Sequence, residues 1–221
     1  MGSSRIGVRE LADAIGAAVP HLDPVEQRIA VGLYRLLARG EPVRPEELAA
    51  AIGVTPDRVH DALGSWPGVY RDEDGRVVGF WGLALGPLDP EYRFHVGGRT
   101  LYTWCAWDTL FIPAILEGIA RVEATCPVTG RTVSLVVDPA GVRVLEPASP
   151  VVSMVGPEGP FGFDVVESFC HRVLSFASTE AGIGWTADHP GTTLLSVEEA
   201  FEVGRRHVRR LASAVLGDRG A

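Results

Sequence analysis

A short Gly/Pro-rich segment divides the chain into two halves whose apolar residues repeat with different periods. Gly86-Pro87-Leu88-Asp89-Pro90 interrupts both patterns, as expected for a linker. Before it, apolar residues recur at the three- and four-residue spacing of helices, whereas after it several segments alternate as strands do. The change predicts an α+β chain, with a helical domain over residues 1–86 and a β-rich domain over residues 87–221.

The first half has the outline of a winged helix. Helices are expected over residues 8–19 and 24–38, followed by a helix-turn-helix pattern over residues 45–66. Two short strands then flank the acidic turn Asp72-Glu73-Asp74-Gly75, which predicts a β-hairpin. Helices followed by such a hairpin predict a winged-helix-like domain.

The charge of this domain argues against nucleic-acid binding. Residues 24–82 contain seven Arg against nine Asp and Glu, and the whole chain has a net charge of −8. The tip of the hairpin carries three carboxylates, which phosphates would repel. We therefore predict a structural domain that binds no nucleic acid.

Nothing in the sequence predicts export or membrane insertion. The N-terminus lacks the apolar run of a signal peptide, and no stretch reaches the roughly eighteen apolar residues of a membrane span. The chain has three Cys, an odd number that indicates free thiols in a reducing compartment. A cytoplasmic protein without membrane association is expected.

The second half is expected to be a β-meander that encloses one central helix. The helix is predicted from Trp104 to about Leu116, with an irregularity at Pro113. A capping box at Ser196-Val197-Glu198-Glu199 predicts a second, C-terminal helix. The predicted strands cover residues 92–96, 118–125, 132–137, 142–145 and 151–155.

The residues that carry chemistry gather around Cys105 and Asp108. They lie three residues apart, beside Trp104 and Trp107, so a helix would place both on one face. A carboxyl buried among aromatic rings is destabilised or has a raised pKa unless it finds a partner. Asp108 is therefore expected either to pair with a cation or to carry a proton.

The Cys and His spacings argue against zinc and dithiol redox motifs. Successive Cys residues are 21 and 44 positions apart, without the close pairs of structural zinc sites. No local signature supports a Cys–His–Asp nucleophile. What remains is two thiols, Cys105 and Cys170, and one carboxyl. Two thiolates suit a soft cation, and a carboxyl beside them can move a thiol proton elsewhere.

This combination resembles the alkylmercury lyases, the bacterial organomercurial lyases. The resemblance covers most of the chain after residue 24 and implies a winged-helix-like domain followed by a β-rich MerB-type domain with a central helix. It rests on Tyr102-Thr103-Trp104-Cys105-Ala106-Trp107-Asp108-Thr109-Leu110, Ala120-Arg121-Val122 with Cys126 and Thr129-Gly130, Ser168-Phe169-Cys170-His171 with Phe176-Ala177-Ser178, and Ser196-Val197-Glu198-Glu199-Ala200 with Gly204-Arg205-Arg206.

The resemblance also implies residue roles. By position, Cys105 and Cys170 match the catalytic thiols, Asp108 the catalytic carboxyl, and Cys126 a structural thiol. The implied reaction is protonolysis of a carbon–mercury bond, in which two thiolates hold mercury and Asp108 protonates the carbon. Cys105 is expected to bind mercury first, and Hg(II) is expected to stay on Cys105 and Cys170, with Asp108 as a further ligand.

The expected partners follow from that reaction. They are organomercurial substrates, low-molecular-weight thiols for turnover, and a mercuric reductase that receives Hg(II); no cofactor is expected. Trp104, Trp107 and Phe169 are expected to wall an apolar substrate pocket that keeps Asp108 protonatable near neutral pH, although ordinary core is the alternative for each ring. Trp107 departs from the family pattern as a bulky residue between Cys105 and Asp108, and is expected to narrow the pocket.

Two other functions stay open on sequence grounds. A winged helix with thiols also suits a metal-responsive transcriptional regulator, against which the acidic helix-turn-helix argues. A non-catalytic carrier of a soft metal is the other alternative. Asp108 favours an enzyme, because a carrier of a soft ion gains little from a carboxyl.

Overall fold

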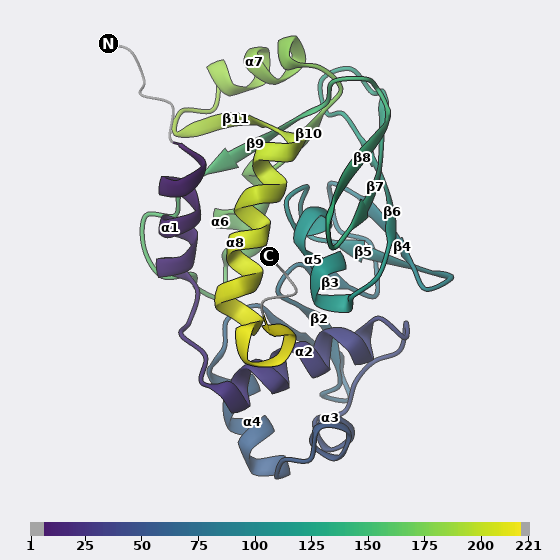
Figure 1. The fold of residues 1–221 in the computed structure, drawn as a ribbon, viewed down its shortest axis with the longest axis vertical. Helices are drawn as coiled ribbons and strands as arrows, with labels where there is room; N and C mark the ends of the chain where they lie inside the picture. The colour runs from purple at the N-terminus through teal and green to yellow at the C-terminus, as the bar shows by residue number, and fades with distance from the viewer. Residues whose placement is uncertain (1–6, 218–221) are drawn as a thin grey trace.

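The structure, a computed structural model, describes residues 7–217 (Figure 1). Its first four helices match the predicted helices and begin at the signals that the sequence carries. The Asp23 side chain accepts hydrogen bonds from the amides of Val25 and Glu26, which completes a capping box in front of Pro24. The helices are α1 (Val8–Ala18), α2 (Pro24–Leu37), α3 (Pro45–Ile52) and α4 (Pro56–Ser65).

One antiparallel sheet runs from the wing into the second half of the chain. Its strand order is β1-β2-β3-β5-β4-β6-β7-β8. The predicted boundary at residues 86 and 87 lies between β3 and β4 of this sheet, so two separate domains remain a prediction. The strands are β1 (Val69–Arg71), β2 (Val77–Phe80), β3 (Leu83–Ala84), β4 (Tyr92–Val96), β5 (Arg99–Thr103), β6 (Ala120–Thr125), β7 (Thr132–Asp138) and β8 (Gly141–Glu146).

The predicted meander is confirmed for β6 to β8 but is wrong for the next strand. β9 (Val151–Val155) leaves the large sheet and forms the centre of a second sheet, between β10 (Ser175–Phe176) and β11 (Thr192–Ser196). All five residues of β9 are buried, so both faces of this strand are covered. The second sheet lies near α7 (Thr179–Ala187), and its separate position could not be read from alternation alone.

The C-terminal helix α8 (Val197–Leu216) joins the two halves of the molecule (Figure 1). It begins at the predicted capping box and packs against α1, α2 and α5. Arg210 of α8 donates to the Ala12 carbonyl and pairs with Asp13, so α1 is held directly against it. The helical first half therefore packs on α8, which also packs against the second half through α5.

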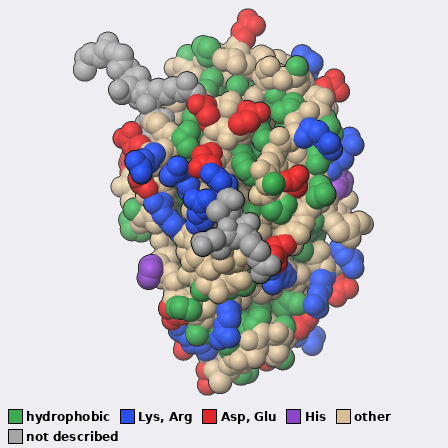
Figure 2. All heavy atoms as spheres, in the orientation of Figure 1, with side chains coloured by type: hydrophobic (Ala, Val, Ile, Leu, Met, Phe, Trp, Pro, Cys, Tyr) green, Lys and Arg blue, Asp and Glu red, His purple; other side chains and the backbone are tan. Residues whose placement is uncertain are grey.

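Three Arg residues of α8 belong to ion pairs. Blue Arg side chains gather beside red carboxylates on the face shown in Figure 2. Arg205 and Arg206 both pair with Glu202. This arrangement is that of a solvated helix face. Among the described residues, no helix combines the length and apolar character needed to cross a bilayer.

Candidate active site

The segment that carries Cys105 and Asp108 is a turn followed by a helix. The predicted helix start at Trp104 is wrong: α5 (Asp108–Leu116) begins four residues later, directly after a turn that follows β5. The Trp104 amide donates to the Gly82 carbonyl at 3.0 Å, and the Ala106 amide donates to the Val173 carbonyl at 3.1 Å. These long-range hydrogen bonds hold the turn before α5 against Gly82 and Val173, which are distant in the sequence.

The late helix start brings the carboxyl back toward Cys105. Asp108 Oδ2 accepts a hydrogen bond at 3.0 Å from the amide of Cys105, three residues before it. The same spacing is found in a capping box, in which a side chain reaches back to an amide three residues earlier. The Thr109 hydroxyl, one residue later, donates to the Ala106 carbonyl at 2.6 Å. Cys105 and Asp108 are therefore held together by local hydrogen bonds rather than by sharing a helix face.

Cys170 reaches the same place from a distant part of the chain. It opens a 3-10 turn, η1 (Cys170–Arg172), after the short helix α6 (Val165–Ser168). The two Sγ atoms and a carboxylate oxygen of Cys105, Asp108 and Cys170 all lie within 4.8 Å of one another, and all three residues are buried. We call these three residues the Cys–Asp–Cys cluster.

Burial sets the protonation of the cluster. It raises the pKa of Asp108 to about 7, despite hydrogen bonds from Cys105 and Trp104 that favour the carboxylate. Burial also raises the pKa of Cys105 well above its usual value. For Cys170 the largest influence, the hydrogen bond with Cys105, lowers the pKa, but burial and the Asp108 charge together leave it raised. The thiols are therefore protonated at neutral pH, beside a carboxyl that exchanges protons near that pH.

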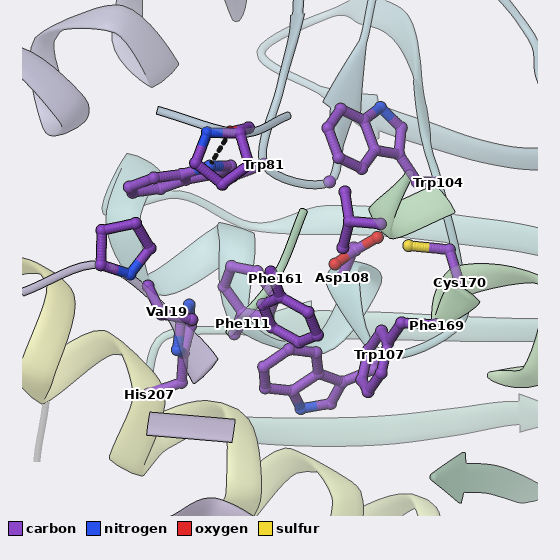
Figure 3. A pocket seen from close by; sticks show the side chains of 14 residues that line it. Val19, Trp81, Trp104, Trp107, Asp108, Phe111, Phe161, Phe169, Cys170 and His207 are labelled. Atoms are coloured by element: carbon purple, nitrogen blue, oxygen red, sulfur yellow. Dashed lines mark hydrogen bonds between the residues drawn. The ribbon is translucent and has the colours of Figure 1, made fainter. Parts of the chain in front are cut away.

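The cluster lies at one end of a small apolar cavity (Figure 3). The cavity has a volume of about 50 Å³, and both Asp108 and Cys170 line it, whereas Cys105 does not. Cys105 has no exposed surface. Of the lining residues, Val19, Pro20, Trp81 and Phe161 are partly exposed, so the mouth of the cavity lies between them. The first half of the chain therefore contributes to the entrance.

The three predicted pocket residues, Trp104, Trp107 and Phe169, all line this cavity. Trp107 packs against Phe111, Phe169 and His207 and fills much of the space beneath Asp108 in Figure 3. Sequence reasoning missed the remaining wall, because no local signal marks those residues. The missed residues include Trp81, Phe111, Phe161 and His207.

Gly82 makes the closest backbone approach to the cluster. It has a φ of +94°, a conformation that glycine adopts readily and other residues do not. A Cβ atom at this position would lie 2.4 Å from Asp108 Cγ. Its carbonyl also accepts the Trp104 amide. Gly82 therefore fixes the position of the Asp108 side chain by contact. The sequence alone did not reveal this role of Gly82.

His207 is a further titratable group in the cavity wall. It comes from α8 and packs against Trp107 and Phe111, with its ring centroid 5.1 and 4.9 Å from theirs. Burial and then the nearby Arg210 charge lower its pKa to about 4. The imidazole is therefore neutral at pH 7 and adds no charge to the cavity.

Trp107 has an unusual environment for its indole N–H. Within the described residues, Trp107 Nε1 is buried without a hydrogen-bond partner, which typically costs about 1–3 kcal/mol. A Cβ at Gly204 would lie 3.4 Å from this nitrogen and 2.8 Å from Phe111 Cβ. Because Gly204 has no side chain, α8 can approach closely here and still leave room for the Trp107 ring. This is the bulky ring that was expected to narrow the pocket.

Cys126 lies outside the cluster, at the turn between β6 and β7. Burial raises the pKa of its thiol, but hydrogen bonds from the Thr129 side chain and from the amides of Ala177, Thr129 and Val128 outweigh burial and leave the pKa lowered. Its backbone closes the turn, since its amide donates to Arg131 and its carbonyl accepts from Gly130. A structural role for this thiol stays a prediction.

Known proteins share both the sequence and the fold of this chain. Residues 88–209 match the family model of alkylmercury lyase (MerB), and residues 8–81 match the helix-turn-helix domain of alkylmercury lyase. The alkylmercury lyase of Streptomyces lividans is 44% identical over 173 residues, which are 78% of each chain. That of Pseudomonas putida is 41% identical over 181 residues, 82% of this chain and 83% of the relative.

A solved structure agrees at the level of the fold. The mercury-bound form of MerB2 superposes with a TM-score of 0.71 over 92% of this chain and 98% of that chain, at 23% sequence identity. The order of the two matched models also agrees with the predicted arrangement of a helical first half and a β-rich second half. On the family models and the sequence identities together, the chain belongs to the alkylmercury lyase family of enzymes.

Proposed function

We propose that this enzyme cleaves the carbon–mercury bond by protonolysis, with Cys105 and Cys170 as mercury ligands and Asp108 as the proton carrier. The observation that carries the proposal is the Cys–Asp–Cys cluster itself, whose ligand atoms lie within 4.8 Å of one another. Two sulfurs suit a soft, two-coordinate cation. A carboxyl with a pKa of about 7 both accepts and donates a proton readily at neutral pH.

The geometry favours Cys170 as the first thiol to meet the substrate. Cys170 lines the cavity and Cys105 does not, which reverses the order that the sequence suggested. In the first step the Cys170 sulfur bonds to the mercury of R–Hg–SR′, the mercury–SR′ bond breaks, and the thiol proton leaves with SR′ as HSR′. The organic group R then remains on mercury inside the cavity.

The second thiol activates the carbon. Cys105 transfers its proton to the Asp108 carboxylate, and its sulfur bonds to mercury. Asp108 then gives this proton to the carbon of R; the electron pair of the carbon–mercury bond becomes the carbon–hydrogen bond, and RH leaves. Mercury stays as Hg(II) on both sulfurs, with Asp108 available as a third ligand. No oxidation or reduction occurs.

The apolar walls support this reaction in two ways. They raise the pKa of Asp108 enough for it to hold the proton, and they accept an apolar R group. A cavity of about 150 Å³ holds benzene, whereas this one is about 50 Å³. Methyl and ethyl groups therefore fit with little change, and an aryl group requires the walls to move.

The remaining parts of the proposal concern partners and compartment. The balanced steps use only the three side chains and a thiol, so we propose that no resident cofactor takes part. Low-molecular-weight thiols release Hg(II) from the two sulfurs, and a mercuric reductase then receives it. All three cysteines are free and the reaction needs reduced thiols, which favours the cytoplasm.

The test is methane release from methylmercury in excess thiol, with Asp108→Asn as the diagnostic variant. The amide keeps the size of the carboxyl but cannot carry the proton. We expect Hg(II) binding to persist, measured as quenching of Trp104 and Trp107 fluorescence, and methane release to fall about 10²- to 10⁴-fold. Parental methane release from this variant would show that the proton comes from another group. Mercury binding without methane release by the parent would instead identify a carrier.

A further inference from the structure

A second, larger cavity lies on the other side of the segment that carries Cys170. It has a volume of about 330 Å³ and is formed by residues 155–162 together with Asp164, Ser168, Phe169 and Arg172. We call it the outer cavity. Phe161 and Phe169 line both the outer cavity and the cavity at the cluster. Their rings meet edge to face with centroids 5.1 Å apart, so this aromatic pair separates the two spaces.

Cys170 and its neighbours divide between the two cavities. Cys170 itself faces the inner, apolar cavity. Ser168, Phe169 and Arg172, on either side of it in the sequence, line the outer one. A mercury atom bound to the Cys170 sulfur is therefore separated from the outer cavity only by the wall that this segment and Phe161 form.

The outer cavity offers charges of both signs. Glu158 and Asp164 are exposed at its edge, and Arg172 is half-buried. One guanidinium nitrogen of Arg172 donates to the Pro190 carbonyl at 2.5 Å, which leaves most of its five N–H donors for another partner. Within the described residues, the Asp164 carboxylate accepts no hydrogen bond. The outer cavity thus presents a cation and two carboxylates beside the apolar Phe161–Phe169 pair.

Thiols that exchange with mercury in water often carry both charges themselves. An α-amino thiol of the cysteine type has an ammonium and a carboxylate a few bonds from its sulfur. The sulfur must reach the mercury, but the charged groups cannot enter the apolar inner cavity without a large loss of hydration. We propose that the outer cavity binds the charged end of such a thiol, with Arg172 on the carboxylate and Asp164 and Glu158 on the ammonium.

This site would serve two exchanges, and the inference rests on the proposed function. On entry, R–Hg–SR′ places R toward the inner cavity and the charged end of SR′ in the outer one; HSR′ then leaves with the Cys170 proton. On product release, two HSR′ molecules each form a sulfur–mercury bond, break one Cys–mercury bond and return a proton to that cysteine. Mercury remains Hg(II) throughout.

The test compares four thiols as supports of multiple-turnover methane release from methylmercury. Cysteine carries both charges, 3-mercaptopropionate only the carboxylate, cysteamine only the ammonium, and 2-mercaptoethanol neither. The half-saturating concentration of each thiol is measured for the parent, Arg172→Gln and Asp164→Asn. Arg209→Gln, an exposed position on α8 outside both cavities, is the matched control. Each ratio compares one thiol with two proteins, so differences in thiol reactivity cancel.

The expected pattern is crossed. Arg172→Gln should raise the half-saturating concentration about tenfold for cysteine and 3-mercaptopropionate, the scale of one charge-assisted hydrogen bond, and less than about twofold for cysteamine and 2-mercaptoethanol. Asp164→Asn should raise it for cysteine and cysteamine only, by a smaller factor because Glu158 remains. Arg209→Gln should change none of the four.

Equal changes for all four thiols, or no change for the charged ones, would overturn the outer-cavity site. Because Arg172 also holds Pro190, thermal melting must show that its variant is folded; Asp164→Asn carries the test if it is not. Methane release with 2-mercaptoethanol reports the lyase reaction separately. A failure of the proposed function would abolish it in every protein, whereas a failure of this inference would leave it intact.

Discussion

The molecule holds buried thiols in two contrasting environments, the Cys–Asp–Cys cluster and the turn at Cys126. Cys105, Cys170 and Cys126 are all buried, yet the pKa values of the first two are raised and that of the third is lowered. In the cluster, aromatic walls and a carboxyl disfavour thiolates. At the turn, the Thr129 side chain and three backbone amides favour one.

The contrast explains why burial alone does not identify a reactive thiol. A thiolate at Cys126 is satisfied by donors of the turn and by the Ala177 amide, and in the part of the chain that the structure describes it has no second sulfur or carboxyl with which to form a metal site. In the proposed reaction, the cluster keeps its thiols protonated until mercury takes the place of the protons. A soft cation then resolves the unfavourable charge that keeps the pKa values raised.

The largest expected effect tests whether the cluster and the turn differ in function. Cys105→Ala and Cys170→Ala should each lower methane release from methylmercury by about 10³-fold or more, as expected for groups that act as a unit. Cys126→Ala should keep turnover within about twofold per folded molecule, with the folded fraction measured by circular dichroism. If Cys126→Ala lost as much activity as the other two, the turn would belong to the active site.

A smaller effect tests how tightly the cluster is packed. Gly82→Ala places a methyl group against Asp108, and a displacement of about 1 Å can lower turnover about 10²-fold. Gly75→Ala is the matched control, because Gly75 also has a positive φ of +76° but has no neighbour within 4 Å of an added Cβ. Both variants should lose similar stability from backbone strain on thermal melting, while Gly82→Ala alone loses activity. Equal activities would show that Gly82 does not position the carboxyl.

The pH dependence of stability tests the electrostatics of the cavity. Asp108 has a folded pKa of about 7 and an ordinary value of 3.8, so the folded state binds more protons between these values and stability falls as pH rises. His207 has a folded pKa of about 4 and an ordinary value of 6.5, so its contribution rises with pH. The two slopes oppose each other between about pH 4 and 6.5, each with a limit of about 1.4 kcal/mol per pH unit.

Urea unfolding of two variants separates these slopes. The free energy of unfolding of Asp108→Asn minus that of the parent should rise from pH 4 to 7. The same difference for His207→Gln should fall from pH 4 to 6.5. If both differences changed in the same direction with pH, the assigned protonation of one of the groups would be contradicted.

The smallest expected effect returns to Cys126. Its lowered pKa means that the unfolded state binds more protons at alkaline pH, so the parent should gain stability relative to Cys126→Ser as pH rises from about 7 to 9. The raised pKa values of Cys105 and Cys170 lower the stability of both proteins as pH rises above about 8.5. Because both proteins contain these thiols, this contribution cancels in the difference between them. Below pH 7 the Cys126→Ser variant should stay within about 1 kcal/mol of the parent, because the same donors can bond to its hydroxyl. A constant difference from pH 7 to 9 would contradict a stabilised thiolate.

Local sequence signals determined much of the fold. Pro24 after Asp23 and the capping box at Ser196 mark helix starts that the structure confirms, since a cap depends on residues only two or three positions away. Alternation likewise predicted β6 and β7. The spacing of Cys105 and Asp108 within one motif already predicted that Asp108 either pairs with a cation or carries a proton.

Tertiary structure decided what surrounds that motif. The turn before Asp108 is held by hydrogen bonds from the Trp104 and Ala106 amides to Gly82 and Val173, and Cys170 joins the cluster through a turn whose position no local pattern specifies. The raised pKa of Asp108, the contact with Gly82 and the neutral His207 all arise from segments far apart in the chain. Caps and periodicity are properties of neighbouring residues, whereas burial and charge in a cavity depend on every element that encloses it.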